Sequence, residues 1–206
     1  MKNIYKNSPS NLNKAKKILN KNNIIAVPTE TVYGLAGNAY SNKSIKKIYK
    51  MKKRPRKNPL IIHYYSLNTL KKDAFLGKEF FKLYKKFSPG PITYIVRKKK
   101  NSKISLMANA NLKTIAIRFP KNNIIRKLLK NLKFPLAIPS ANISSAVSPV
   151  SSSDVLDEFS NKLNFILDGG ISKIGLESTV INLYGKTQIL RPGAISQGQV
   201  SKVLKK

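Results

Sequence analysis

Eight short apolar segments, separated by turn residues or by helical patterns, most strongly limit how this chain of 206 residues can fold. They are rich in β-branched and aromatic residues, which favour strands. The segments lie at residues 24–27, 60–65, 92–97, 114–118, 136–139, 164–167, 179–183 and 188–190. A membrane-spanning helix needs about 20 consecutive apolar residues. Since every segment is much shorter than that, we expect no membrane-spanning helix and no membrane partner.

Apolar residues at helical spacing appear between these segments. They predict helices at residues 11–21, 43–53, 78–87, 122–132 and 152–160, and a C-terminal helix that begins near Ser196. Ser10 is the expected N-cap of the first helix, and Ser41 or Asn42 that of the second. Several strands follow one another without room for a crossover helix between them. The sequence therefore predicts a single α/β domain over residues 1–206, built on a sheet of mixed direction.

The residue types that are absent or rare exclude several kinds of site. With no Cys and one His in the chain, we expect no disulfide, no thiolate nucleophile, no protein metal site and no prosthetic group. Eight acidic residues are too few to suggest a protein cage for Mg²⁺, so any Mg²⁺ would be carried mainly by the phosphates of a substrate. The basic N-terminus is not followed by an apolar region, which predicts a cytoplasmic protein.

The net charge of +32 has two interpretations. A basic surface attracts nucleic acid and other polyanions. However, 34 of the 40 basic residues are Lys, a bias that mutational drift in an AT-rich genome would produce at solvated positions. Arg is the better bidentate partner of phosphates and carboxylates. In this chain the six Arg and the eight acidic residues are therefore the more informative charges.

Those informative charges gather in a few loops. Residues 28–37 follow a predicted strand and combine Glu30 with two Thr and two Gly. Hydroxyl and Gly residues also accompany Asp168, Glu177 and Arg191 in the segments at 138–145, 168–183 and 189–195. Open sheets bind ligands at the ends of their strands, and backbone amides with hydroxyls suit anions. Ordinary turns rich in Ser, Thr and Gly are the alternative.

Residues 50–63 carry a basic cluster where the chain leaves a predicted helix. Pro55 disfavours α geometry at Arg54, so we expect Lys52 and Arg54 to point away from the helix. We interpret the cluster as a phosphate clamp, and a helix C-terminus that attracts cations is the alternative. His63 ends the following strand with no nucleophile motif near it, which favours a structural or substrate-contacting role.

Six motifs follow one another between about residue 24 and residue 195. They are PTETVYGL, KxRP followed by NPLIIH, AIR, PSAN, GLESTV and LRPG. In this order they make the chain resemble the YrdC-like threonylcarbamoyl-adenylate synthases. The resemblance implies a single-domain twisted mixed sheet with flanking helices around a concave basic cavity. Longer members of the family carry an additional C-terminal domain, which we do not expect here.

The resemblance also implies an activity and its substrates. Members of the family are nucleotidyltransferases that make threonylcarbamoyl-AMP and pyrophosphate from L-threonine, bicarbonate and ATP, the first step of threonylcarbamoyl-adenosine formation in tRNA. The residues that match positions holding L-threonine are Thr31, His63, Arg118, Ser140 and Ser178. Those that match positions around ATP are Lys52, Arg54, Asn58, Thr114, Asn142, Ser148 and Arg191. Lys52 and Arg54 would be catalytic, as charges that face the phosphates.

Three positions depart from the family pattern. Ser145 stands where the family has Gly after the PSAN motif, and Val150 replaces a residue with a hydroxyl group. These changes affect the residues through which this loop would contact the nucleotide. We therefore expect Ser148 or Ser151 to provide the missing contact. Asn182 stands where related sequences carry Asp.

Two other functions remain open at this stage. One is an RNA-binding protein of the same fold, whose binding of tRNA or double-stranded RNA would depend steeply on salt. The other is a paralogue that acts on another acyl or carbamoyl adenylate. For the synthase itself, we expect weak RNA binding at most, with the threonylcarbamoyl transferase proteins that consume the adenylate as downstream partners.

Overall fold

Ten strands of the computed structural model, which describes residues 3–204, join into one sheet. The strand order is β1-β8-β2-β3-β7-β4-β6-β5-β9-β10. The strands are β1 (Ile4–Lys6), β2 (Ile25–Val27), β3 (Gly34–Asn38), β4 (Ile61–His63), β5 (Ile92–Arg97), β6 (Thr114–Arg118), β7 (Leu136–Ala137), β8 (Ile166–Asp168), β9 (Thr179–Asn182) and β10 (Gln188–Arg191). Parallel and antiparallel neighbours alternate irregularly along this order. The prediction of an α/β sheet of mixed direction is confirmed.

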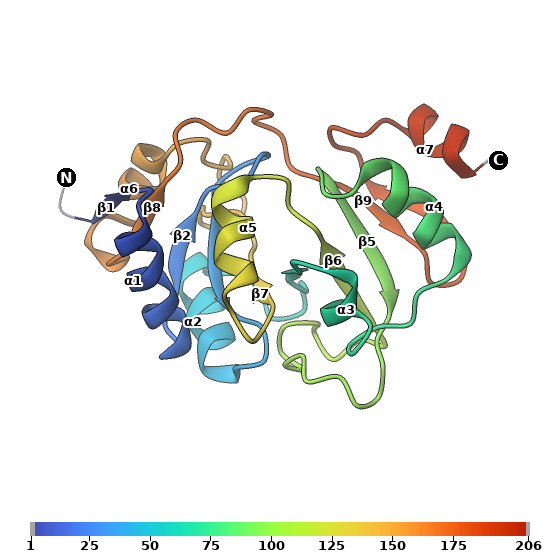
Figure 1. Ribbon diagram of the computed structural model, residues 1–206, viewed down its shortest axis with the longest axis horizontal. Coiled ribbons are helices and arrows are strands. Elements are labelled where there is room, and N and C mark those ends of the chain that lie inside the picture. Colours follow the sequence, from blue (N-terminus) through green and yellow to red (C-terminus); the bar gives the residue numbers. More distant parts are fainter. Residues whose placement is uncertain (1–2, 205–206) are drawn as a thin grey trace.

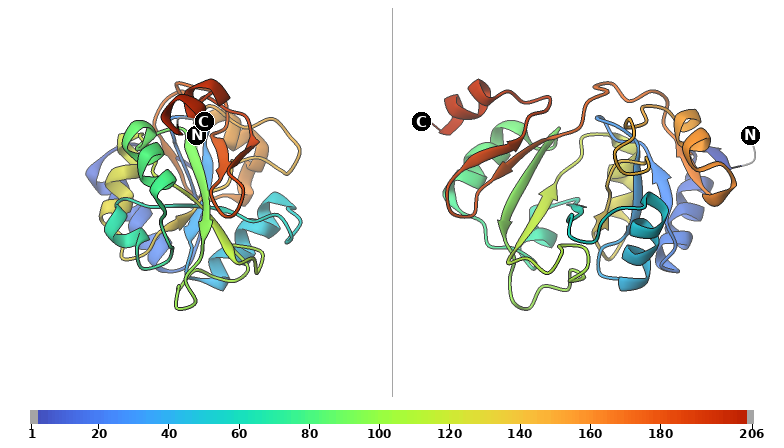
Figure 2. Two further views of the ribbon diagram at one scale, coloured as in Figure 1. Left: turned by 90° about the vertical axis from the view of Figure 1, so that its right-hand side faces the viewer. Right: turned by 180° about the vertical axis from the view of Figure 1, so that it is seen from behind.

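Seven α-helices and one short 3₁₀ helix accompany the sheet in the described part of the chain. They are α1 (Pro9–Asn20), α2 (Asn42–Lys52), α3 (Leu67–Leu70), α4 (Lys78–Phe87), α5 (Asn123–Lys130), α6 (Ser152–Phe159), α7 (Gln197–Leu204) and the 3₁₀ helix η1 (Ser160–Lys162). The two ends of the chain lie at opposite ends of the long axis (Figure 1), and they overlap when the molecule is viewed along that axis (Figure 2).

Each predicted helix is present in the structure, although several of them begin or end at other residues than predicted. The first helix begins at Pro9 and its cap is Ser8, whose hydroxyl accepts from the Asn11 amide, so the prediction of Ser10 as cap is wrong. Pro is favourable in the first turn because its missing N–H has no partner there anyway. Ser41 caps α2, as one of the two predicted residues. Residues 205 and 206 of the predicted C-terminal helix lie outside the described residues.

Among the strands and α-helices, three elements were not predicted from the sequence. Residues 28–37 were expected to form a loop, but strand β3 begins within them at Gly34 and ends at Asn38. Its sequence, GLAGN, contains no β-branched residue, and pairing with β2 and β7 on both sides gives it strand geometry. Strand β1 and the single turn of α3 are likewise too short to show a periodicity.

Helices cover both faces of the half of the sheet that contains β2. Ile25 and Val27 point into a core shared with α1 and α5, whereas Ala26 points into a separate core shared with α6. Successive side chains of a strand point to opposite faces, so a strand buried on both sides reads as a continuous apolar run. Figure 1 shows α1 and α5 in front of these strands.

The other half of the sheet is covered differently. Ile115 and Ile117 of β6 pack in the largest core, which includes residues of α2, α4 and α7. The alternate residues Thr114, Ala116 and Arg118 therefore share the opposite face. That face carries the pocket described below. Among the described residues, no helix is long and apolar enough to cross a membrane.

Candidate functional site

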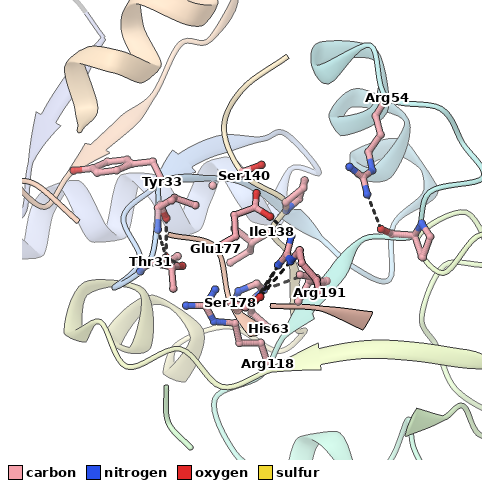
Figure 3. A pocket seen from close by; sticks show the side chains of 16 residues that line it. Thr31, Tyr33, Arg54, His63, Arg118, Ile138, Ser140, Glu177, Ser178 and Arg191 are labelled. Carbon is pink, nitrogen blue, oxygen red and sulfur yellow. Dashed lines mark hydrogen bonds and ion pairs between the residues drawn. The ribbon is translucent and has the colours of Figure 1, made fainter. Parts of the chain in front are cut away.

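A pocket lies where the loops after β2, β7 and β8 meet the ends of β4, β6 and β10 (Figure 3). Its lining is Thr29, Thr31, Val32, Tyr33, Gly34, Arg54, Pro59, Ile61, His63, Arg118, Ile138, Pro139, Ser140, Glu177, Ser178 and Arg191. All five residues matched to L-threonine are in this lining. Of the residues matched to ATP, Arg54 and Arg191 are in it. The fold thus brings together segments that lie far apart in the sequence.

Sheet register sets the positions of two central residues. Strands β4 and β6 run parallel, with His63 beside Arg118 and Ile61 beside Ala116. Side chains two residues apart share a face, so Ile61 and His63 both line the pocket. Since Arg54 lies before β4 and His63 ends it, the pocket has two ends. We call them the Arg118 end (Thr31, His63, Arg118 and Ser178) and the Arg54 end (Arg54 and Pro59). Ser140 follows β7, which runs antiparallel to β4 with Leu136 beside His63, so Ser140 lies toward the Arg54 end.

Arg118 is paired with an acid that the sequence did not place in the site. Its Nη2 donates to Glu30 Oε1 at 2.7 Å, and both side chains are buried. Glu30 Oε2 also accepts from the backbone amides of Lys121 and Asn122, at 3.0 and 3.2 Å. Burial alone would raise the pKa of Glu30, but the Arg118 charge and these hydrogen bonds lower it below its usual value. The Nε of Arg118 has no hydrogen-bond partner in the described chain.

His63 is held as a neutral ring. Burial, followed by the positive charge of Arg118, lowers its pKa well below the ordinary value. Its Nδ1 lies 3.3 Å from the Ile61 carbonyl oxygen, which can only accept, so Nδ1 carries the hydrogen. The Nε2 atom is then a bare acceptor, and it is buried without a partner among the described residues. A donor group of a ligand in the pocket would satisfy it.

Two pairs of hydrogen-bonded hydroxyl groups lie at the Arg118 end. Thr29 and Thr31 join their hydroxyl oxygens at 2.8 Å, and Thr29 Oγ1 also donates to the Val32 carbonyl oxygen at 2.6 Å. The Thr29 hydrogen is used in that bond, so Thr31 donates to Thr29 and keeps its own oxygen as an acceptor. Ser178 and Thr93 form the second pair, also at 2.8 Å. The hydroxyl groups are thus oriented before any ligand arrives.

Arg191 reaches the pocket from the end of β10. Its Nε and Nη2 donate to the Ser178 carbonyl oxygen at 3.2 and 2.9 Å, and its Nη1 forms an ion pair with Glu177. The other carboxylate oxygen of Glu177 accepts from the Ser148 hydroxyl at 3.0 Å. Burial, and then repulsion from Arg118 and Arg54, lowers the pKa of Arg191. The guanidinium groups of Arg54, Arg118 and Arg191 therefore combine their positive potential in this pocket, which favours an anionic ligand.

Gly193 allows the segment after β10 to approach residues 177–179 closely. A Cβ on Gly193 would lie 2.4 Å from the Thr179 amide nitrogen and 2.5 Å from the Glu177 carbonyl oxygen. No other side chain fits between the segment after β10 and residues 177–179. The Gly in the LRPG motif thus has a packing reason that spacing alone does not show.

Lys52 lies differently from Arg54. It is the last residue of α2, is 1% exposed, and is absent from the pocket lining in the described chain. Its ammonium donates to the carbonyl oxygens of Ser140 and Asn142, at 2.6 and 2.5 Å, and to Asn142 Oδ1 at 3.2 Å. Burial, followed by repulsion from Arg54, lowers the pKa of Lys52 to about 8. The Lys52 side chain does leave its helix, but it is directed to residues 140–142 and not, like Arg54, into the pocket lining.

The remaining residues matched to ATP lie outside the lining. The Asn58 carbonyl oxygen accepts from Arg54 Nε at 3.1 Å. Thr114 shares the strand face of Arg118 but lies at the far end of β6. The Asn142 side-chain amide donates to the carbonyl oxygens of Ile143 and Ala146. Their contacts with ATP, and those of Ser148, stay predictions.

The three departures from the family pattern each have a structural setting. Ser145 has φ 77°, a left-handed conformation that costs a non-Gly residue of the order of 1 kcal/mol or more, which explains a family preference for Gly. Val150 uses its backbone, since its amide donates to Asp154 and its carbonyl oxygen accepts from the Ser172 amide. Asn182 holds the turn between β9 and β10 through the carbonyl oxygens of Tyr184 and Lys186.

Two acids of the site were missed as site residues, although the sequence contained a signal for both. Glu30 and Glu177 are among only eight acids in the chain, and both stand in the motif-bearing loops. Rarity indicated that they matter. Their partners, Arg118 and Arg191, are 88 and 14 residues away along the chain, so the pairing itself needed the structure.

Comparisons with known proteins agree with this fold. The model of the Sua5/YciO/YrdC family, described as "Telomere recombination", matches residues 17–193. A threonylcarbamoyl-AMP synthase of Pyrococcus abyssi is 40% identical over 183 residues, which cover 88% of this chain and 53% of that protein. One of Bacillus subtilis is 38% identical over 192 residues, which cover 92% of this chain and 55% of that protein. The chain spans about half the length of these curated relatives.

Solved structures are similar over nearly the whole chain. A variant of P. abyssi Sua5 has a TM-score of 0.95 and 36% identity, covering 100% of this chain and 61% of that one. P. abyssi Sua5 complexed with L-threonine has a TM-score of 0.92 and 36% identity, covering 98% of this chain and 60% of that one. E. coli YciO, with a TM-score of 0.81 and 23% identity, covering 94% of this chain and 97% of that one, shares the fold. Because the family model, the sequences of the relatives and the fold all match, the chain belongs to the Sua5/YciO/YrdC family.

Proposed function

We propose that the chain is a threonylcarbamoyl-AMP synthase, a nucleotidyltransferase that converts L-threonine, bicarbonate and ATP into threonylcarbamoyl-AMP and pyrophosphate. The observation that carries the proposal is the lining of the pocket. There, all five residues matched to L-threonine line one pocket, and the Arg118 Nε and His63 Nε2 atoms are buried without partners in the described chain. The curated relatives bear this name, and one similar structure is a complex with L-threonine.

The Arg118 end suits an amino acid with a hydroxyl group. The free Nε of Arg118 can donate to the carboxylate while Glu30 holds Nη2 in place. Neutral His63 offers an acceptor to a hydroxyl or amine hydrogen. The oriented hydroxyls of Thr31 and Ser178 add further partners. A site built to hydrogen-bond a hydroxyl rejects the analogue that lacks it, so L-valine should bind much more weakly than L-threonine.

The Arg54 end and Arg191 suit the phosphates of ATP. The threonine amine first takes up bicarbonate and releases water, which gives a carbamate. A carbamate oxygen then attacks the α-phosphorus, and pyrophosphate leaves with the electron pair of the broken P–O bond. The protein needs no nucleophile of its own for these steps. Its contribution is to hold the two reactants together and to stabilise the charge of the transition state with guanidinium groups.

We expect Mg²⁺ to arrive with ATP. Residues 3–204 contain no group of three His, Cys, Asp or Glu residues that could hold a metal ion. The carboxylates nearest the pocket, Glu30 and Glu177, are engaged by Arg118 and Arg191. This donor set fits an ion held by phosphate oxygens, whose chemistry is to neutralise charge on the triphosphate.

The proposed product determines the partners that we expect. A mixed anhydride of a carbamate and AMP hydrolyses readily, so a transferase that delivers the threonylcarbamoyl group to tRNA should act soon after it forms. We therefore propose threonylcarbamoyl transferase proteins as partners, a cytoplasmic location, and weak direct binding of tRNA or double-stranded RNA at most.

The test is pyrophosphate release by the purified chain. We expect release only when ATP, L-threonine and bicarbonate are all present, and a loss of roughly a hundredfold or more in Arg54→Ala, since one charge-stabilising donor contributes about that much. Arg56→Ala is the matched control, because Arg56 is exposed and does not line the pocket in the described chain. Release without threonine would favour the paralogue, and tight RNA binding without any turnover would favour the RNA-binding protein.

A further inference from the structure

We propose that Lys52 is a positioning residue, whose ammonium holds residues 140–146, the Ser140 loop, in the conformation that presents Ser140 to the pocket. This role rests on the proposed function, because it gives Lys52 a part in threonine binding. It differs from the role that the sequence motif implies, which is direct contact with phosphate.

The hydrogen bonds of the ammonium carry the proposal. A Lys ammonium has three hydrogens and no other donor. The Lys52 ammonium has three acceptors within hydrogen-bond distance, namely the carbonyl oxygens of Ser140 and Asn142 and the Asn142 side-chain oxygen. With all three hydrogens engaged and 1% of the residue exposed, Lys52 has no donor left for a phosphate unless the loop first lets go.

The backbone of Lys52 also holds the loop. Its carbonyl oxygen accepts from the Ser144 amide at 2.9 Å. On the other side, Glu158 Oε1 of α6 accepts from the Ile143 amide at 2.6 Å. The loop contains Ser145 in a left-handed conformation, which such a residue keeps only when its surroundings hold it. Lys52 and Glu158 are thus opposite anchors of one strained loop.

Arg54 provides the contrast. The chain turns out of α2 at Lys53, which has φ 49°, and this turn separates the directions of the side chains on either side of it. Arg54 lines the pocket and donates to the Asn58 and Pro59 carbonyl oxygens, both at 3.1 Å. Figure 3 shows Arg54 away from the cluster of His63, Ser178 and Arg118. Two cations of one motif therefore have different contacts: Arg54 lines the pocket, whereas Lys52 holds the Ser140 loop.

This division has a measurable consequence. Ser140 lines the pocket and is matched to L-threonine, so a loop released from Lys52 should weaken L-threonine binding even when no nucleotide is present. A lysine that only contacted phosphate would not affect threonine alone. Loss of Arg54, which leaves the Ser140 loop in place, should weaken nucleotide binding and spare threonine.

The experiment compares Lys52→Met with Arg54→Met by calorimetry. L-Threonine is titrated without nucleotide, and the α,β-methylene analogue of ATP is titrated without threonine. We expect Lys52→Met to raise the Kd of threonine about tenfold or more, and Arg54→Met to leave it within about twofold. Lys50→Met is the control, since Lys50 is an exposed lysine in the same last turn of α2. If Lys52→Met binds threonine like the wild type and loses only the analogue, the proposal is overturned.

Two further measurements keep the result clear. If Lys52→Met fails to fold, Lys52→Arg keeps the charge but cannot place three N–H groups in the same way; normal threonine affinity in that variant would overturn the proposal. Amide hydrogen exchange of Ser144 and Ala146 without ligands should become about tenfold faster in either variant. If the wild type binds no threonine, the proposed function fails, while the exchange rates still decide whether Lys52 holds the loop.

Discussion

The two arginine–carboxylate pairs of the pocket show how its two sides differ. Arg118 and Glu30 have side chains that are 5% and 9% exposed, whereas those of Arg191 and Glu177 are 36% and 32% exposed. Glu30 is also fixed by two backbone amides at the start of α5. Glu177 is instead shared between Arg191 and the hydroxyl of Ser148.

The difference in burial indicates that the Arg118–Glu30 pair stabilises the fold, whereas Arg191 and Glu177 can separate and take other partners. Removing one partner of a buried pair leaves an uncompensated charge away from water, which is costly. A half-exposed pair contributes little, because water replaces each partner well. Arg191 and Ser148 are both matched to ATP, so the Glu177 carboxylate occupies partners that a phosphate would need. We therefore expect Glu177 to leave them when a nucleotide binds.

The largest expected effect is that of Glu30→Gln. The change leaves the Arg118 charge buried without a counter-charge, so the free energy of unfolding should fall by about 3–5 kcal/mol. Urea denaturation monitored by circular dichroism measures it. Asp157→Asn removes one negative charge from an exposed position on α6 and is the matched control, with an expected change below about 0.5 kcal/mol. An equally small change in Glu30→Gln would show that the buried pair does not stabilise the fold.

The pH dependence of stability should show an intermediate effect. The pKa of Glu30 is lower in the folded chain than its ordinary value of 4.5, so its contribution is fully present above that value and is lost as the pH falls through the folded pKa. The stability difference between the wild type and Glu30→Gln should therefore shrink as the pH falls from about 5.5 to 3. A difference that stays constant over this range would mean that Glu30 does not hold its proton more weakly after folding.

The smallest expected effect is that of Glu177→Gln. Its free energy of unfolding should change by less than about 1 kcal/mol, since an exposed pair contributes no more than that. The variant should bind the α,β-methylene analogue of ATP more tightly, by up to about fivefold, because the competing charge is gone. Calorimetry measures both ligands, and the threonine Kd should not change. Weaker binding of the analogue would instead mean that Glu177 holds Arg191 in place for the phosphates.

Much of the fold could be predicted from the spacing of apolar residues, because that spacing depends only on residues close together in the sequence. The alternation in β6 places Ile115 and Ile117 in the largest core and Arg118 on the opposite face, which carries the pocket. Helices such as α4 and α6 lie where apolar spacing predicted them. Strand β3 was missed because its geometry comes from pairing with β2 and β7, which no local pattern records.

The sequence by itself determined the mixed α/β class, the order of the motifs and the small set of charges worth examining. Those properties follow from composition and from spacing along the chain. Only the tertiary structure decided what each charge does: Glu30 neutralises Arg118, Glu177 holds Arg191, and Lys52 holds two carbonyl oxygens. The physical reason is that the interaction of a charged group depends on its distance to partners and on its burial, and folding sets both.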